Sequence, residues 1–148
     1  MTALDLAALL LHVDQNFRSS FCESQAMTIE FDILALGNAI VDVIARAEDD
    51  FLVAQGVAKG SMTLIDEEQA ERLYAAMGPA TIISGGSAAN TVVGAASFGA
   101  HCAFVGRVKA DPVGEVFAHD IVKSGVAFGT PAAIDGPATA RSFILVTP

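Results

Sequence analysis

The sequence is poor in positive charge, and this shortage excludes several classes of function. Only 8 of its 148 residues are Lys or Arg, against 17 Asp or Glu, which gives a formal net charge of −9. Binding to nucleic acid or to an anionic membrane needs clustered cations, so we expect neither as a partner. A phosphorylated ligand is compatible with this charge, because backbone N–H groups at a helix N-terminus bind anions without a cationic side chain.

Cysteine, histidine and long apolar runs are also scarce. A disulfide framework or a zinc site needs more ligands at closer spacing than the two cysteines offer, so a reduced, cytoplasmic protein is the simplest interpretation. No apolar run approaches the roughly 18 residues of a membrane-spanning helix. The histidines are scattered, so we expect no metal site. These residues are Cys22, Cys102, His12, His101 and His119.

The first 26 residues differ from the rest of the chain. They contain an apolar stretch at 4–13, but no Lys or Arg precedes it, as a signal peptide would require. We expect residues 1–26 to be an extension outside the fold, with a targeting or docking helix as the alternative. The domain is expected to occupy residues 27–148, because a complete apolar run follows soon after Met27.

From residue 31 onward, short apolar runs alternate with amphipathic segments. Asp111, Pro112 and Gly125 are typical start and stop signals of a helix. The pattern predicts helices over 48–55, 67–77, 87–98 and 112–123. It predicts strands over 31–36, 40–45, 61–65, 80–84, 102–105, 126–129 and 141–146. This order indicates a layered α/β fold with a small β addition.

A pair of glycines stands where the predicted strand 80–84 meets the predicted helix 87–98. Gly85 and Gly86 let the backbone approach a ligand without a Cβ in the way, and the N–H groups of the helix start point to the same place. Asn90, one turn into the helix, could both accept from and donate to a hydroxyl group. A tight strand-to-helix turn without any ligand explains the same residues equally well.

Asn38 and Asp42 follow the first predicted strand, in the string GNAIVD. A carboxylate inside an apolar run is costly unless it is paired, so Asp42 either caps something or faces a polar ligand. A carboxylate can accept two adjacent hydroxyl groups at once, which suits a sugar diol. No dinucleotide fingerprint and no phosphate loop occur, which disfavours an oxidoreductase domain. Residues 106–114 are either a loop with a helix cap or a wall of a ligand cleft.

Three motifs occur in one order: GN-x-x-x-D, then GGSAAN, then G-x-x-x-x-D-x-x-G at 106–114. This order resembles the N-terminal half of the ribokinase/PfkB family of sugar and nucleoside kinases. The adenosine-kinase-like branch fits best, because it shares the insertion at 50–66 and the GGS form of the glycine motif. The resemblance covers about residues 29–148. It implies a ribokinase-like layered α/β/α (Rossmann-like) sheet with a small β lid, in a domain that lacks its C-terminal half.

The resemblance also implies roles for individual residues. Asp42 would hold the sugar hydroxyls, and the glycine motif would close around the same sugar. Apolar contacts would come partly from the strand 61–65 of a β lid, with 139–147 as another lid strand; such lids exclude water. The implied substrate-binding residues are Asn38, Ile40, Asp42, Met62, Leu64, Gly85, Gly86, Ser87 and Asn90.

The family's later half carries a G-A-G-D anion hole, a catalytic Asp, an N-x-x-E motif and the ATP pocket, and none of these strings occurs here. The resemblance therefore implies no catalytic residue in this chain, with ATP and Mg²⁺ bound only by a complete enzyme. We expect the substrate-binding part of a kinase that phosphorylates a primary hydroxyl of a sugar or nucleoside, itself inactive, with a homodimer through the lid as one option. The alternative is a non-catalytic sugar-binding or lid-pairing module from a truncated gene.

Overall fold

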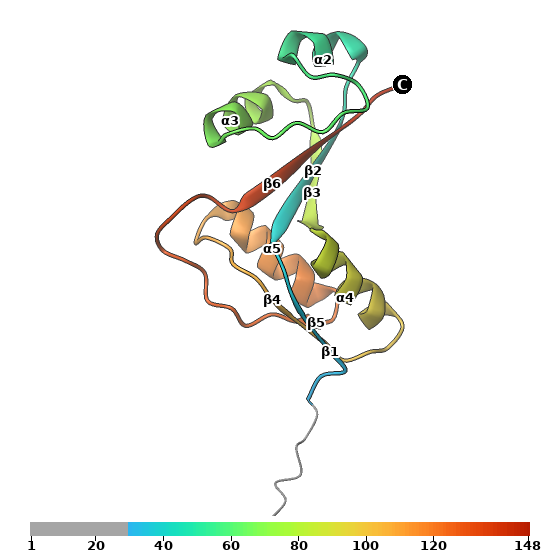
Figure 1. Ribbon diagram of the computed structural model, residues 1–148, viewed down its shortest axis with the longest axis vertical. Coiled ribbons are helices and arrows are strands. Elements are labelled where there is room, and N and C mark those ends of the chain that lie inside the picture. Colours follow the sequence, from blue (N-terminus) through green and yellow to red (C-terminus); the bar gives the residue numbers. More distant parts are fainter. Residues whose placement is uncertain (1–29) are drawn as a thin grey trace, which may run out of the picture. The chain divides into compact units, whose positions relative to one another are not determined.

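The structure, a computed structural model, describes residues 30–148 (Figure 1). The expected extension at 1–26 lies outside the described residues. Six strands and four helices follow one another in the described part. In chain order they are β1 (Ile33–Leu36), β2 (Ile40–Arg46), α2 (Asp49–Gln55), α3 (Glu67–Ala76), β3 (Ala80–Gly85), α4 (Ser87–Ser97), β4 (Cys102–Val105), α5 (Pro112–Lys123), β5 (Val126–Ala127) and β6 (Ala140–Val146).

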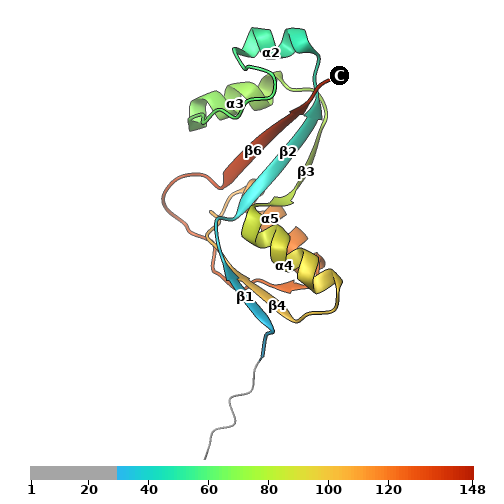
Figure 2. The ribbon, with the colours of Figure 1, turned by 45° about the vertical axis from the view of Figure 1, so that its right-hand side comes forward.

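The strands form two separate sheets of three strands each (Figure 2). The first, called the β1 sheet, has the order β1-β4-β5, and its strands are all parallel. The second, called the β2 sheet, has the order β3-β2-β6; β2 runs antiparallel to β3 and parallel to β6. The chain therefore places the strand before the glycine pair in the β2 sheet, outside the parallel β1 sheet.

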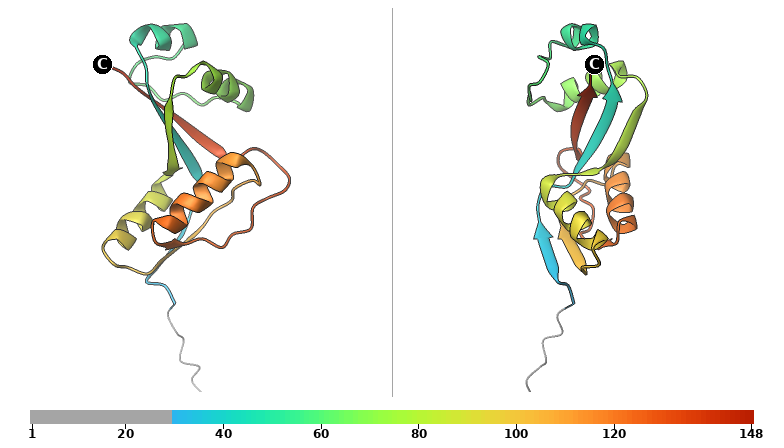
Figure 3. Two further views of the ribbon diagram at one scale, coloured as in Figure 1. Left: turned by 180° about the vertical axis from the view of Figure 1, so that it is seen from behind. Right: turned by 90° about the vertical axis from the view of Figure 1, so that its right-hand side faces the viewer.

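The core lies between the β1 sheet and helices α4 and α5, which lie on the same side of that sheet (Figure 3). Phe117 of α5 is fully buried, and its ring centroid lies 5.7 Å from that of Phe104 on β4 and 5.5 Å from that of Phe128. Ala89 and Val92 of α4 are buried in the same cluster. The small side chains of α4 suit close packing of a helix on a sheet.

The helix boundaries follow the sequence signals. The Asp111 carboxylate accepts a hydrogen bond from Gly114 N at 2.7 Å, Pro112 is the first residue of α5, and Gly125 follows its end with φ +86°. Asp66 and Gln69 form a reciprocal capping box at the start of α3. These four helices confirm the predicted ones within one residue at either end.

One face of the β2 sheet is covered and the other is open. Val41 and Val43 are buried on the covered face, and the ring of Phe143 lies 6.4 Å from that of Tyr74 on α3. Arg141 of β6 bridges to Glu71 of α3 at 2.6 Å and lies over the Phe143 ring. The alternate residues of β2 point to the open face, because neighbouring side chains of a strand point to opposite faces.

The predicted strand at 61–65 was wrong. The segment is an irregular loop between α2 and α3, with a turn in which Ser61 N–H donates to Ala58 O at 3.2 Å. Met62 and Leu64 are 82% and 89% exposed. Their side chains therefore lack the packing neighbours that stabilise a strand. β5 is also shorter than expected, because only two of its residues pair with β4.

The mixed α/β architecture predicted from the sequence is confirmed in residues 30–148, where helices are interspersed with strands and the strands of the β1 sheet are all parallel. No helix in this part of the chain is both long enough and apolar enough to cross a membrane.

The aromatic cluster around α5 gives the first testable prediction. Phe117→Ala should lower the free energy of unfolding by about 3–5 kcal/mol, because a fully buried ring is replaced by a cavity. Phe98→Ala is the matched control: that ring is 94% exposed, and its loss should change stability by less than about 0.5 kcal/mol. Denaturant unfolding of both variants measures this, and equal losses would contradict the assigned core.

Candidate functional site

The two motifs singled out in the sequence meet where β2 begins and β3 ends. In the antiparallel pair β2–β3, Ile40 lies opposite Gly85 and Asp42 lies opposite Ile83. The chain leaves β3 directly through Gly86 into α4. The structure thus brings GNAIVD and GGSAAN together at one end of the β2 sheet.

The glycines are required by the closeness of this contact. A Cβ at Gly85 would overlap the carboxylate of Asp42. A Cβ at Gly86 would lie 2.8 Å from the carbonyl oxygen of Asn38, and the φ of Gly86 is +95°, a conformation that other residues rarely adopt. The glycine pair is therefore a place of close approach between β2 and the start of α4, as the sequence indicated.

Asp42 is half-buried on the open face of the β2 sheet. Among residues 30–148, no cation lies within ion-pair distance of its carboxylate, and it caps neither α2, α3, α4 nor α5. Its cross-strand neighbours are Ile83 on β3 and Ser142 on β6. Asp42 therefore caps none of these four helices, and within residues 30–148 its carboxylate makes no ion pair.

The start of α4 offers hydrogen-bond donors beside this carboxylate. Gly86 is its N-cap residue and has no side chain to cap the first turn. Ser87 and Asn90 are both exposed in that turn, and the Asn90 N–H donates to Gly86 O at 2.8 Å. The N–H groups that precede this bond have no partner within a helix, and they carry the partial positive charge of the helix start.

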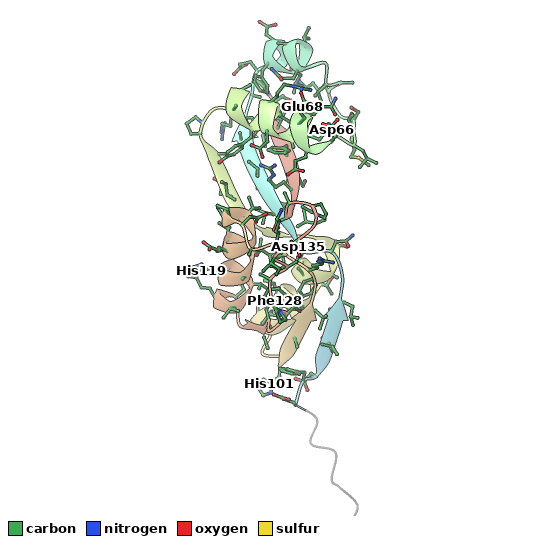
Figure 4. All side chains as sticks on the ribbon, turned by 90° about the vertical axis from the view of Figure 1, so that its left-hand side faces the viewer. Asp66, Glu68, His101, His119, Phe128 and Asp135 are labelled. Carbon is green, nitrogen blue, oxygen red and sulfur yellow. The ribbon has the colours of Figure 1, made fainter. Side chains whose placement is uncertain are left out.

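A cavity of about 240 Å³ adjoins the same end of the β2 sheet. It is lined by residues 38–39, 107–109, 133 and 137–140. At its rim the Arg107 guanidinium donates to Asp135 O at 3.3 Å, and Lys109 Nζ donates to Gly136 O at 2.8 Å (Figure 4 labels Asp135). Residues 107–109 of the segment 106–114 therefore line a cavity that also includes Asn38.

Asp111 and Thr139 form a partly buried polar link beside this cavity. Asp111 accepts hydrogen bonds from Thr139 N at 2.9 Å and from Thr139 Oγ1 at 2.8 Å, and Thr139 Oγ1 accepts one from Lys109 N at 2.9 Å. Burial by itself raises the pKa of Asp111, but the hydrogen bonds from Thr139 and Gly114, helped by the charge of Lys109, outweigh burial and hold the pKa below its ordinary value. This link fixes the start of β6.

The remaining residues singled out in the sequence are distributed as follows. Ile40 lies on the same face of β2 as Asp42, whereas Met62 and Leu64 lie in the exposed loop and belong to no strand of the β2 sheet. His101 lies just before β4 and His119 lies in α5 (Figure 4), and no group of three or more potential metal ligands occurs within residues 30–148.

Sequence reasoning placed Thr139 and Ser142 in a lid strand at 139–147 but gave neither residue a role of its own. Ser142 lies opposite Asp42 in the β2–β6 pairing, and Thr139 is the buried partner of Asp111. Both come from a segment that is far from residues 38–42 in sequence, so only the strand register reveals them. The apolar run in RSFILV predicts a strand, but it does not predict which strand is its neighbour.

The chain is similar to solved structures of kinases. The probable sugar kinase from Rhizobium etli CFN 42 is 49% identical with a TM-score of 0.72, and the match covers 81% of this chain and 36% of that one. The adenosine kinase from Sinorhizobium meliloti is 52% identical with a TM-score of 0.71, covering 80% and 36%. The Anopheles gambiae adenosine kinase, 23% identical with a TM-score of 0.66 over 78% and 37%, shows the fold alone.

These likenesses confirm the expected resemblance and the ribokinase-like fold class. The chain spans only about 36% of the length of the two bacterial kinases. No protein-family model matches the sequence. The comparison with curated proteins gives no match either.

The lowered pKa of Asp111 predicts a specific dependence of stability on pH. Because the pKa is lower in the folded chain than the unfolded value near 3.9, the carboxylate stabilises the fold above about pH 4, and this contribution is lost as the pH falls through the folded pKa. Asp111→Asn keeps a good capping side chain but does not titrate. Between about pH 5 and about pH 2, wild type should therefore lose more unfolding free energy than Asp111→Asn.

The control for this prediction is Asp50→Asn, which removes an exposed carboxylate in the first turn of α2. Its stability should fall with pH as steeply as that of wild type. Parallel pH profiles for wild type and Asp111→Asn would contradict the role of the Asp111–Thr139 link.

Proposed function

Because the chain shares its fold and about half of its aligned sequence with ribokinase-like sugar and adenosine kinases, we propose that it is the substrate-binding part of such a kinase. The complete enzyme would transfer a phosphoryl group to a primary hydroxyl of a sugar or nucleoside. The observation that carries this proposal is the Asp42 carboxylate, which no cation pairs within residues 30–148 and which lies against the glycine turn.

The proposed chemistry of Asp42 is recognition of a diol. Two carboxylate oxygens can accept from two adjacent hydroxyl groups, and each charge-assisted hydrogen bond contributes about 1.5–3 kcal/mol. Asn90 and the open N–H groups of the first turn of α4, at Ser87, would complete the set of polar groups around the sugar. Asn38 would lie beside them, since its carbonyl packs on Gly86.

The open face of the β2 sheet would cover the rest of the substrate. Ile40 lies on this face next to Asp42, and Ile83 and Ile144 share the face in the strand register. Closing this face over a substrate would exclude water from the reacting hydroxyl. Met62 and Leu64 would add apolar contacts from the loop, because their side chains are exposed and could reach a substrate.

ATP and Mg²⁺ belong to the complete enzyme in this proposal. When bound, they supply the phosphoryl group and neutralise its charge. Residues 30–148 contain no group of three or more acidic, His or Cys ligands for a metal ion, so we assign no step through either group to these residues. The role left to this chain is to bind and orient the hydroxyl that is phosphorylated.

A non-catalytic module that pairs through the β2 sheet is the second candidate. It is favoured by one observation: Ile83, Ile144 and Val146 leave 41%, 38% and 48% of their surface exposed in this sheet. This candidate would be favoured over the kinase if the isolated chain formed a dimer, and if that dimer bound a sugar without dissociating.

The kinase proposal predicts how two substitutions act in a complete enzyme, obtained by joining this chain to the part of the Rhizobium etli sugar kinase that it does not match. Asp42→Ala and Asn90→Ala should each lower kcat/KM for the sugar or nucleoside, Asp42→Ala on the order of 100-fold. The KM for ATP should change little. Coupled assays of ADP release, with adenosine and ribose, measure this.

The controls separate binding from folding. The isolated 148-residue chain is the blank and should show no turnover. Asp50→Ala removes an exposed carboxylate away from the site and should leave kcat/KM unchanged. If Asp42→Ala melts normally and keeps wild-type kcat/KM, Asp42 is not a substrate ligand and the proposal fails.

A further inference from the structure

Asp120 of α5 binds the backbone of β3 directly before the glycine pair. Ser84 N donates a hydrogen bond to Asp120 Oδ2 at 3.2 Å. β3 is the outer strand on its side of the β2 sheet within residues 30–148, and alternate N–H groups of an outer strand point away from the sheet and need another acceptor. The Asp120 carboxylate supplies that acceptor at the last residue before Gly85.

The carboxylate of Asp120 stands at an unfavourable place on its own helix. Asp120 lies in the last turn of α5, where a negative charge is disfavoured because the carbonyl end of a helix is itself partly negative. Within residues 30–148 no Lys or Arg forms an ion pair with it. Its Oδ1 lies 3.4 Å from Nδ1 of His119, whose side chain is 71% exposed (Figure 4), and exposed pairs of this kind are weak. The bond to Ser84 is therefore the contact that explains a carboxylate here.

Helix α5 holds both outer strands of the β2 sheet through two such carboxylates. Near its start, Asp111 accepts a hydrogen bond from Thr139 N at 2.9 Å, one residue before β6. Near its end, Asp120 accepts from Ser84 N of β3. The strand β2, which carries Asp42, lies between β3 and β6. A helix that packs in the core therefore fixes the strands on either side of the candidate site.

We propose that Asp120 is a positioning residue of this site. Two successive glycines leave the backbone unusually free, so the turn after β3 needs an anchor outside itself. By holding Ser84 N, Asp120 fixes this turn and decides where the first turn of α4 lies relative to the Asp42 carboxylate. The inference rests on the proposed function, because the groups that Asp120 orients, Asn90 among them, are those proposed to bind the substrate.

The first test uses the joined enzyme, in which the unmatched part of the Rhizobium etli sugar kinase completes this chain. Asp120→Ala should raise the KM for the sugar or nucleoside roughly tenfold, because the donors of α4 are no longer held in place, and should change the KM for ATP by less than about twofold. Asp120→Asn keeps an oxygen that accepts from Ser84 N and should restore most of the lost affinity. Glu115→Ala is the matched control, since it removes an exposed carboxylate from the same helix, and it should leave both constants unchanged.

A double-mutant cycle separates positioning from a purely structural role. If Asp120 acts through the start of α4, the losses in kcat/KM caused by Asp120→Ala and Asn90→Ala should not multiply, and the double variant should be at least about threefold more active than their product. A structural role would lower the melting temperature and leave the two losses independent. An unchanged KM in Asp120→Ala, or losses that multiply, would overturn the proposal.

A measurement on the full 148-residue chain does not depend on a substrate. Hydrogen exchange at the Ser84 amide, followed by NMR, should be slow in wild type and in Glu115→Ala, and on the order of tenfold faster in Asp120→Ala. Equal exchange rates in wild type and Asp120→Ala would also overturn the proposal. If the joined enzyme turns over no sugar or nucleoside, the proposed function fails, and the exchange rates still decide whether Asp120 holds the turn.

Discussion

The Asp42 carboxylate lies so close to Gly85, and the carbonyl oxygen of Asn38 so close to Gly86, that neither position has room for a Cβ. This contact decides where Asp42 lies, because the strand that carries the carboxylate is held against the strand that leads into α4. It also decides where α4 starts, and with it where uncapped N–H groups point. A side chain at position 85 would displace the carboxylate of Asp42. The geometry of the candidate site therefore depends on glycine at both positions.

A second link holds the third strand of the β2 sheet. Asp111 caps α5 and at the same time binds Thr139, the residue before β6. One carboxylate thus connects a helix of the core to the strand that lies beside Asp42 in the register. The core supplies stability through the buried aromatic cluster, whereas the groups proposed to bind substrate are exposed or half-buried. Substitutions can therefore separate folding from binding.

Local signals were enough to predict the helices and most strands. The caps at Asp66 and Asp111 satisfy backbone groups within three residues, so the sequence alone contains the interaction. The segment 61–65 was mistaken for a strand because alternation alone does not show whether a neighbouring strand is present, and none pairs with it in the described part.

The candidate site was predictable only in part, because some of its residues are brought together by contacts distant in sequence. The Gly85–Gly86 pair and Asp42 could be singled out because each breaks a local rule: glycines stand at a strand end, and a carboxylate interrupts an apolar run. Ser142 breaks no such rule and becomes notable only through its register with β2. Register depends on contacts distant in sequence, and the same is true of the cavity that Asn38 shares with residues 107–109.

The central claim is that the Asp42 carboxylate binds two adjacent hydroxyl groups of the substrate. The most direct measurement compares, in the joined enzyme, kcat/KM for an accepted sugar or nucleoside with that for its analogue lacking one of the two hydroxyls. Removing the hydroxyl should cost wild type roughly tenfold or more and should cost Asp42→Ala little, because the partner is already gone. Equal losses in both enzymes would show that the hydroxyl is bound elsewhere and would contradict the account.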